Sequence, residues 1–298
     1  MMIWTLVILI IILVLVIGIS TFVGWQLTHP KKKPVDDSPE NYGLNWKDVT
    51  FASRKQDVKL DGWFLEAESE PAVSKRITII MSHGYAGTRL EKGLPALALA
   101  KALVEAGHHV LMFDFRNSGR SEGNTTTIGY LEKDDILGAI DWVKSTATAP
   151  TPILLIGFSM GGTASILAAA EEKSVSGVIT DSAFSQLYPY LKDNLPVWSK
   201  LPRIPFTPLI LFILPKLIGV NIHAVDALAA TDGIAPRPVL FIHSRDDLAI
   251  PYTNSVQMQE RHPNDFELWL TTQAGHVGSF QIQPEAYIVR VLKFITKL

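Results

Sequence analysis

Short apolar runs rich in β-branched residues alternate with helical segments along most of this chain, and no other feature of the sequence restricts the fold as strongly. The runs expected to form buried strands are 76–84, 108–115, 152–159 and 175–184. The segments of helical composition between them are 94–107, 128–145 and 160–173. Such alternation is typical of βαβ units, in which helices cover both faces of a parallel sheet. The sequence therefore predicts an α/β fold with a mostly parallel, twisted sheet.

The flanking regions extend this pattern. Residues 48–53 and 58–67 alternate apolar with polar side chains, which predicts antiparallel strands with one buried face. Residues 237–244 and 266–272 predict two further strands, and 284–298 predicts a closing helix.

One segment interrupts the alternation. Residues 187–220 contain apolar stretches broken by prolines, and each stretch is too short to span a membrane. We expect a helical cap inserted at about residues 184–235. An apolar cap above the strand ends would line a pocket for an apolar group.

The N-terminal stretch from Ile3 to Trp25 contains no charged side chain. As a helix rising about 1.5 Å per residue it would cross roughly 30 Å of hydrocarbon, with Trp4 and Trp25 near the two interfaces. The alternative is the cleaved signal peptide of a secreted protein. Such a peptide has a basic start, a shorter apolar run and an A-x-A-like cleavage site. The stretch therefore favours an uncleaved transmembrane anchor over residues 1–27.

Three lysines, Lys31, Lys32 and Lys33, follow the apolar stretch. By the positive-inside rule they place the rest of the chain in the cytoplasm. We therefore expect a single-pass membrane protein with a cytoplasmic domain. Residues 28–43 are polar and rich in proline and charge, which predicts a linker. Residues 44–298 then form one domain together with the cap.

Composition excludes several function classes. The formal net charge is −2 and the pI is about 6.4, so no basic field favours a nucleic-acid partner. The chain has no cysteine, which excludes disulfides, thiolate catalysis and cysteine-ligated zinc. It contains no H-E-x-x-H, P-loop or dinucleotide-binding pattern. We therefore expect neither a metal ion nor a cofactor.

The pentapeptide Gly157-Phe158-Ser159-Met160-Gly161 has the form G-x-S-x-G and lies between an expected strand and an expected helix. In a nucleophile elbow the serine lies on a tight, strained turn at the end of a strand. The two glycines let the strand and the helix approach each other without Cβ clashes. This context predicts that Ser159 is an exposed nucleophile. The alternative is a glycine-rich turn with a helix-capping serine.

A serine hydroxyl needs a base, which a histidine oriented by a carboxylate supplies. In sheets of this kind the order along the chain is serine, acid, histidine. Asp246 and Asp247 follow the strand at 237–244, and His276 lies in a glycine-flanked loop after the strand at 266–272. Ligands bind at the carboxyl ends of parallel strands, where all these residues are expected.

Together these motifs resemble the α/β-hydrolase family from about residue 50 to the C-terminus. The segments that carry the resemblance are SHGYAG at 82–87, DFRNSGRS at 114–121, GFSMGG at 157–162, HSRDDLAIP at 243–251 and AGH at 274–276. The chain is most similar to the serine-aminopeptidase-like or BEM46-like branch, which includes membrane-anchored hydrolases. The resemblance implies an α/β-hydrolase fold.

The resemblance also implies roles for individual residues. Ser159 matches the nucleophile and His276 the base. The family pattern H-G-x-x-D-x-x-V-P aligns with residues 243–251 and selects Asp247 as the acid, with Ser244 in place of the glycine and Ile250 in place of the valine. Asp246 remains an alternative acid, and Asp181 would serve in a variant whose acid has moved to the preceding strand.

The oxyanion hole requires two N–H donors aimed at the developing charge. The resemblance points to the backbone of Met160, directly after the nucleophile, and to that of Tyr85 in the HGYAG loop. His83 is expected to hold that loop through hydrogen bonds.

We therefore expect a membrane-anchored serine hydrolase that cleaves acyl esters or thioesters through an acyl-enzyme intermediate. Its substrate would be a small-molecule or lipid-like acyl compound. The sequence leaves two alternatives open, an aminopeptidase-type peptidase and a non-catalytic binding protein on the same fold. Fold alone does not decide between them.

Overall fold

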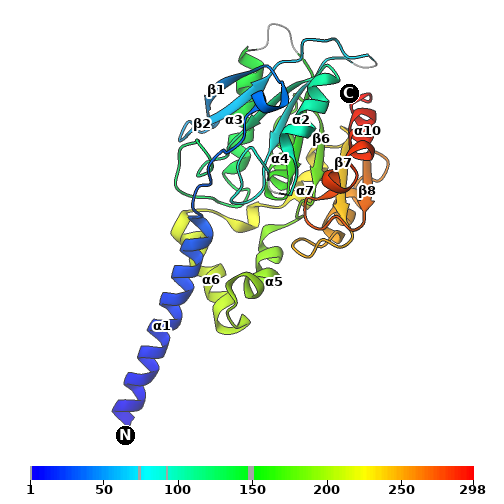
Figure 1. Cartoon of the computed structure of the whole chain (residues 1–298). Coiled ribbons are helices and arrows are strands. Elements are labelled where there is room, and N and C mark those ends of the chain that lie inside the picture. Colours follow the sequence, from blue (N-terminus) through cyan, green and yellow to red (C-terminus); the bar gives the residue numbers. More distant parts are fainter. Residues whose placement is uncertain (1, 73–74, 92, 147–150) are drawn as a thin grey trace.

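The computed structural model describes residues 2–72, 75–91, 93–146 and 151–298. Its centre is an eight-stranded sheet with the strand order β1-β2-β4-β3-β5-β6-β7-β8 (Figure 1). The strands are β1 Trp46–Ala52, β2 Lys59–Leu65, β3 Thr78–Ser82, β4 His109–Phe113, β5 Ile153–Phe158, β6 Val175–Asp181, β7 Val239–Ser244 and β8 Phe266–Thr271.

Strand direction follows the sequence-based expectation. β2 pairs antiparallel with β1 and β4, and all the pairs from β4 through β3, β5, β6, β7 and β8 are parallel. The predicted mostly parallel sheet with an antiparallel start is confirmed. The carboxyl ends of β3, β5, β6, β7 and β8 consequently meet at one edge, where ligands bind in folds of this type.

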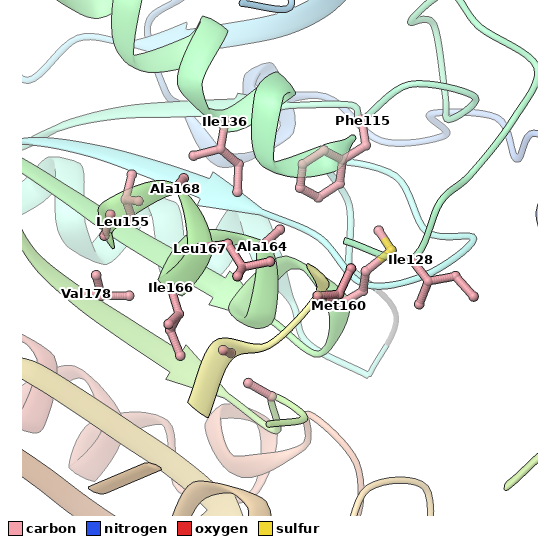
Figure 2. Close-up of a cluster of buried hydrophobic side chains, with 14 of the residues drawn as sticks. Phe115, Ile128, Ile136, Leu155, Met160, Ala164, Ile166, Leu167, Ala168 and Val178 are labelled. Carbon is pink, nitrogen blue, oxygen red and sulfur yellow. The ribbon is translucent and has the colours of Figure 1, made fainter. Parts of the chain in front are cut away.

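Helices cover both faces of the sheet because its central strands are apolar on both sides. Successive side chains of a strand enter different cores: Ile80 and Leu155 lie in one, Ile79 and Leu154 in the other. Helices α3 (Glu132–Thr146) and α4 (Met160–Glu171) pack in the first core. Helices α2 (Ala96–Glu105) and α10 (Pro284–Ile295) pack in the second. Figure 2 shows α4 lying along the sheet, with Ala168 near Leu155 of β5.

The segment expected to form a cap is helical. It contains α5 (Leu187–Ser199) and α6 (Arg203–Ile218), the latter with a kink at Ile204. Leu191 and Leu195 of α5 and Ile210 of α6 are buried in the core on the α3–α4 side. The remaining helical elements are short: η1 Pro39–Tyr42, η2 Ile222–Ala224, α7 Ala227–Ala230, η3 Thr231–Gly233, α8 Thr253–Glu260 and α9 Ser279–Ile282.

The N-terminal helix α1 (Met2–Thr28) projects from the domain (Figure 1). Among the described residues it alone is long and apolar enough to cross a membrane, with a mean hydropathy of 3.3 over its most apolar window. Only 6% of that window is buried, so the rest of the protein leaves it largely uncovered. Its last turns pack on α6, where Gly24 approaches Leu214.

The residues after α1 lie along the loop that follows β4. The carbonyl of Thr28 accepts the N–H of Thr126 at 2.7 Å, and the carbonyl of Pro30 accepts the side-chain amide of Asn117 at 3.3 Å. Lys32 donates to the carbonyl of Ser121 at 2.5 Å. The first part of the expected linker is thus attached to the domain, while the domain boundaries themselves stay a prediction.

Candidate active site

Ser159 lies in the turn between β5 and α4, with φ 52° and ψ −119°. This left-handed φ is strained for a side chain other than glycine, as expected for an elbow that exposes its serine. A Cβ at Gly157 would lie 2.4 Å from the carbonyl oxygen of Gly161. A Cβ at Gly161 would lie 2.3 Å from the carbonyl oxygen of Ser82. Only glycine fits at either position, because the strands and the helix meet there backbone to backbone.

His276 lies in the loop after β8 and reaches back to the elbow. Its Nε2 is 2.9 Å from Ser159 Oγ. Gly275 and Val277 on either side both have left-handed φ angles, 61° and 59°. The N–H of Val277 donates to Ser182 Oγ at 3.1 Å, which ties the loop to the end of β6.

Asp247 lies on the other side of the imidazole. Its Oδ2 is 2.7 Å from His276 Nδ1, and its Oδ1 accepts the N–H groups of Ala249 and Ile250 at 2.8 and 2.9 Å. Burial alone would raise the pKa of Asp247, but hydrogen bonds from His243 and His276 outweigh burial and hold that pKa well below its usual range. The carboxylate is therefore charged and fixed in orientation.

His243 supports Asp247 from within the core, a role that the sequence did not reveal. Its Nε2 lies 2.9 Å from the carbonyl oxygen of Ile250 and 3.3 Å from Asp247 Oδ2. A carbonyl oxygen only accepts, so Nε2 carries the hydrogen. Its Nδ1 lies 2.7 Å from the hydroxyl oxygen of Ser255. The motif HSRDDLAIP contains this histidine, but the residue type alone does not show whether its side chain contacts Asp247.

The two other candidate acids do not contact His276. Asp246 accepts the Ser244 hydroxyl and, at 3.3 Å, the N–H of Gly275, so it holds the histidine loop from outside. Asp181 is fully buried at the end of β6 and accepts the Ser182 hydroxyl at 3.1 Å. Burial raises the pKa of Asp181 to about 6. The structure thus places Asp247 against the imidazole. The other two carboxylates form hydrogen bonds with residues near His276 and not with its ring.

The two residues expected to supply oxyanion donors flank Ser159. Met160 is the first residue of α4, so no carbonyl of that helix accepts its N–H. Tyr85 follows Gly84, where a Cβ would lie 3.3 Å from Ser159 Cβ. The hydroxyl of Tyr85 donates to the carbonyl of Leu27, in the last turn of α1, at 2.6 Å.

His83 fixes the loop that carries Tyr85. Its Nε2 accepts the N–H of Phe115 at 3.0 Å, so its Nδ1 carries the hydrogen and donates to the carbonyl of Gly84 at 2.7 Å. Burial lowers the pKa of His83 to about 4, so the imidazole is neutral. This geometry agrees with the structural role expected for this histidine.

A cavity of about 270 Å³ opens beside Ser159 and is mainly apolar. Its lining consists of Leu27, Gly84, Tyr85, Glu91, Ile128, Ser159, Met160, Phe184, Tyr190, Trp198, Ala249, Ile250 and His276. Leu27 of α1 and Glu91, whose carboxylate accepts the N–H of Gly84, were not among the sequence candidates. Both come from segments whose position depends on tertiary packing, and no local pattern marks them.

A larger cavity of about 520 Å³ lies where β3 and β4 begin, at the opposite edge of the sheet. Its one described histidine, His109, accepts the N–H of Ala67 through Nδ1 at 3.1 Å. The candidate site is the smaller cavity, because Ser159 and His276 line it and neither lines the larger one. Within the part of the chain that the structure describes, no group of three or more His, Cys, Asp or Glu side chains could hold a metal ion.

Comparison with known proteins gives matches over the same region. A family model described as alpha/beta hydrolase fold matches residues 77–209. The uncharacterized protein YqkD of Bacillus subtilis is 30% identical over 223 residues, which cover 74% of this chain and 72% of the relative. The lysophosphatidylserine lipase ABHD12 of Danio rerio is 26% identical over 241 residues, which cover 72% of this chain and 58% of the relative.

Among solved structures, the esterase Pf2001 of Pyrococcus furiosus superposes with a TM-score of 0.74 at 28% identity. The match covers 91% of this chain and 98% of that one. The acylaminoacyl peptidase of Pyrococcus horikoshii has a TM-score of 0.60 at 18% identity, which is a likeness of fold alone.

Proposed function

Since this chain belongs to the alpha/beta hydrolase family, we propose that it is a serine hydrolase that cleaves acyl esters or thioesters through Ser159, His276 and Asp247. The observation that carries the proposal is the hydrogen-bond chain of 2.9 Å from Ser159 Oγ to His276 and 2.7 Å from His276 to Asp247. Both distances lie within the reach that nucleophile activation needs. The likeness to an esterase over nearly the whole chain supports hydrolase chemistry.

The proposed reaction is acyl transfer in two steps. Ser159 Oγ attacks the carbonyl carbon of the substrate while His276 Nε2 takes its proton and then gives it to the leaving group. Asp247 holds the Nδ1–H tautomer and stabilises the imidazolium that forms. The N–H groups of Tyr85 and Met160 stabilise the tetrahedral oxyanion. Water, activated by the same imidazole, then releases the acyl group from Ser159.

The substrate class is inferred from the cavity and the anchor. Apolar side chains, including Ile128, Phe184 and Ile250, line most of the cavity and favour an acyl chain. A relative named a lysophosphatidylserine lipase is consistent with a lipid-like ester. The apolar helix α1 and the lysines after it support a single-pass membrane protein whose domain faces the cytoplasm.

A fluorophosphonate probe tests the nucleophile directly. We expect the full-length protein in detergent to be labelled and the Ser159→Ala variant to remain unlabelled. Ser145→Ala, at an exposed serine of α3, is the matched control and should label like the parent. A folded parent that resists the probe would favour a non-catalytic binding protein.

A substrate panel separates the remaining alternatives. Acyl esters and thioesters of graded chain length are compared with aminoacyl anilides at equal concentration. Turnover of the esters, abolished in Ser159→Ala, is the expected result. Preference for the anilides would identify a peptidase and reject the proposed substrate class.

A further inference from the structure

The cap carries an exposed apolar surface that the domain does not cover. Ile204 is 79% exposed, Val197 70% and Phe212 63%. We use the name cap surface for five exposed residues of α5 and α6: Val197, Trp198, Ile204, Phe212 and Leu217. Large apolar side chains left exposed on one inserted segment are candidates for contact with a protein or a membrane.

Charge around the cap surface indicates which of these partners it meets. The segment from Leu187 to Ile218 contains four basic residues and one acidic residue, although the whole chain has a net charge of −2. The acidic residue, Asp193, is paired with Arg203 at 2.7 Å, and Lys216 Nζ lies 3.5 Å from the ring centroid of Phe212. Apolar side chains beside exposed lysines are typical of surfaces that dip into anionic headgroups.

Helix α1 places the cap surface at membrane level. Gly24 packs on α6, where its Cβ position would lie 3.8 Å from Leu214 Cβ. Gly24 is next to Trp25, at the end of the apolar stretch and before Lys31. Figure 1 shows α6 beside the part of α1 nearest the domain. A bilayer that surrounds α1 would therefore meet α6 at its headgroup region.

A row of aromatic rings connects the cap surface to the cavity. Phe184 stacks on Tyr190 with a centroid distance of 5.1 Å, and Tyr190 and Trp198 form an edge-to-face pair with the same centroid distance, 5.1 Å. All three line the cavity beside Ser159, and Trp198 is also 40% exposed at the cap surface. Leu27 of α1 lines the same cavity.

We propose that the cap surface lies in the headgroup region of the bilayer beside α1, and that a single acyl chain passes from the lipid between Leu27 and Trp198 to Ser159. This inference rests on the proposed acyl hydrolase. It names the substrate as a membrane-resident amphiphile with one ester-linked chain, because a cavity of about 270 Å³ is at the lower limit for a ligand pocket.

Membrane contact can be measured without any assay of activity. The natural chain has no cysteine, so Phe212→Cys and the control Val289→Cys each carry one attachment site. Val289 is equally exposed, at 66%, but lies on α10. Each full-length variant receives an NBD fluorophore and is reconstituted into vesicles of phosphatidylcholine and phosphatidylglycerol.

We expect lipids with a doxyl group near the glycerol to quench NBD at residue 212 and to leave residue 289 unaffected. Equal exposure of the two labels to aqueous iodide would overturn the proposal. Shielding of residue 212 that depends on protein concentration and not on lipid would indicate a second copy of the chain and would also overturn it.

The entry path is tested by the double variant Ile204→Glu/Phe212→Glu, which changes no residue of the cavity lining. Turnover of a monoacyl ester presented in vesicles should fall about tenfold or more, since withdrawing two apolar side chains from lipid costs more than about 1.4 kcal/mol. Turnover of a water-soluble acetate ester should stay within about twofold, because it needs no lipid contact. Val289→Glu is the control.

Unchanged turnover of the vesicle substrate in this double variant would reject the entry path. Failure of the proposed function looks different. In that case no ester is hydrolysed and the fluorophosphonate probe leaves Ser159 unlabelled, whereas the quenching result at residue 212 stands independently.

Discussion

At the scale of single residues, two buried carboxylates near His276 have opposite surroundings. Asp247 accepts N–H groups from Ala249 and Ile250 and contacts the imidazole, and these bonds stabilise its charge. Asp181 accepts the Ser182 hydroxyl through Oδ1, while its Oδ2 has no hydrogen-bond partner among the described residues. The same residue type thus serves as a charged partner in one place and as a poorly solvated group in the other.

Substitution of the two adjacent aspartates should have unequal effects on turnover. Asp247→Asn removes the charge beside Nδ1 and should lower kcat at least about a hundredfold, since the wrong imidazole tautomer is then favoured. Asp246→Asn should lower it less than about fivefold, because the asparagine oxygen can still accept a hydrogen bond from the Ser244 hydroxyl or the Gly275 N–H. Steady-state hydrolysis of a soluble ester measures both. A larger loss in Asp246→Asn would reassign the acid.

Asp181→Asn should stabilise the protein at alkaline pH. The pKa of Asp181 is raised from 3.8 to about 6 in the folded protein, so ionisation of this group opposes folding. The penalty is fully present above pH 6, amounts to at most about 3 kcal/mol, and is relieved as the pH falls towards 4. The Tm advantage of the variant should therefore be larger at pH 8 than at pH 4.5 in thermal unfolding. An advantage that is the same at both pH values would contradict this assignment.

At the scale of elements, the elbow depends on how closely β3, β5 and α4 approach each other. The Cβ of an alanine at Gly161 would overlap the carbonyl oxygens of Ser82 and His83, at 2.3 and 2.5 Å. These backbone groups cannot rotate away as a flexible side chain would. The strained φ of Ser159 is therefore maintained by contacts of the surrounding strands.

Gly161→Ala should lower the free energy of unfolding by about 2 kcal/mol or more and abolish probe labelling of Ser159. Gly18→Ala is the control, since nothing lies within 4 Å of its Cβ position. Thermal unfolding in detergent and fluorophosphonate labelling measure the two effects. Normal labelling of Gly161→Ala would show that α4 can move away from the end of β3 without loss of the elbow geometry.

Elements with a strong local pattern were predictable from the sequence. The mostly parallel sheet and the helices on both faces could be predicted because β-branched runs and apolar stripes are local signals. The structure confirms both. Helix α8, with the polar sequence TNSVQMQE, has no apolar stripe that would predict it. The contact of Gly24 with Leu214 joins segments far apart in the chain and has no local signal.

The candidate site was predictable to a similar degree. Residue types and strand ends pointed to Ser159 and His276, and the structure brings them together, although their catalytic roles remain predictions. The choice between Asp246 and Asp247 depends on which side chain turns inward. The N–H groups of Ala249 and Ile250 hold the Asp247 side chain in its inward orientation. The direction of these N–H groups cannot be read from the sequence.

At the scale of the whole molecule, hydrogen bonds join the end of α1 to the loops around the candidate site. The carbonyls of Leu27, Thr28 and Pro30 accept hydrogen bonds from Tyr85, Thr126 and Asn117, respectively. The apolar helix, the cap and the elbow loop therefore form one connected assembly.

A fragment that begins at Asn41 should accordingly be impaired even towards soluble esters. It lacks Leu27 in the cavity wall and the acceptor for the Tyr85 hydroxyl, and each lost hydrogen bond costs about 1 kcal/mol. We expect a Tm at least about 3 °C below that of a fragment that begins at Val23, together with slower ester turnover. Equal Tm values and rates in detergent would show that α1 contributes only attachment.

If α1 spans a bilayer as proposed, the bond between Tyr85 and Leu27 couples the hydrophobic thickness of that bilayer to the candidate active site. A transmembrane helix longer than the local hydrocarbon layer tilts to match it. Tilt of α1 would displace the carbonyl of Leu27 and, through the phenol ring, the backbone of Tyr85, which we propose as an oxyanion donor. Turnover would then vary between thin and thick membranes even when the substrate and its concentration stay the same.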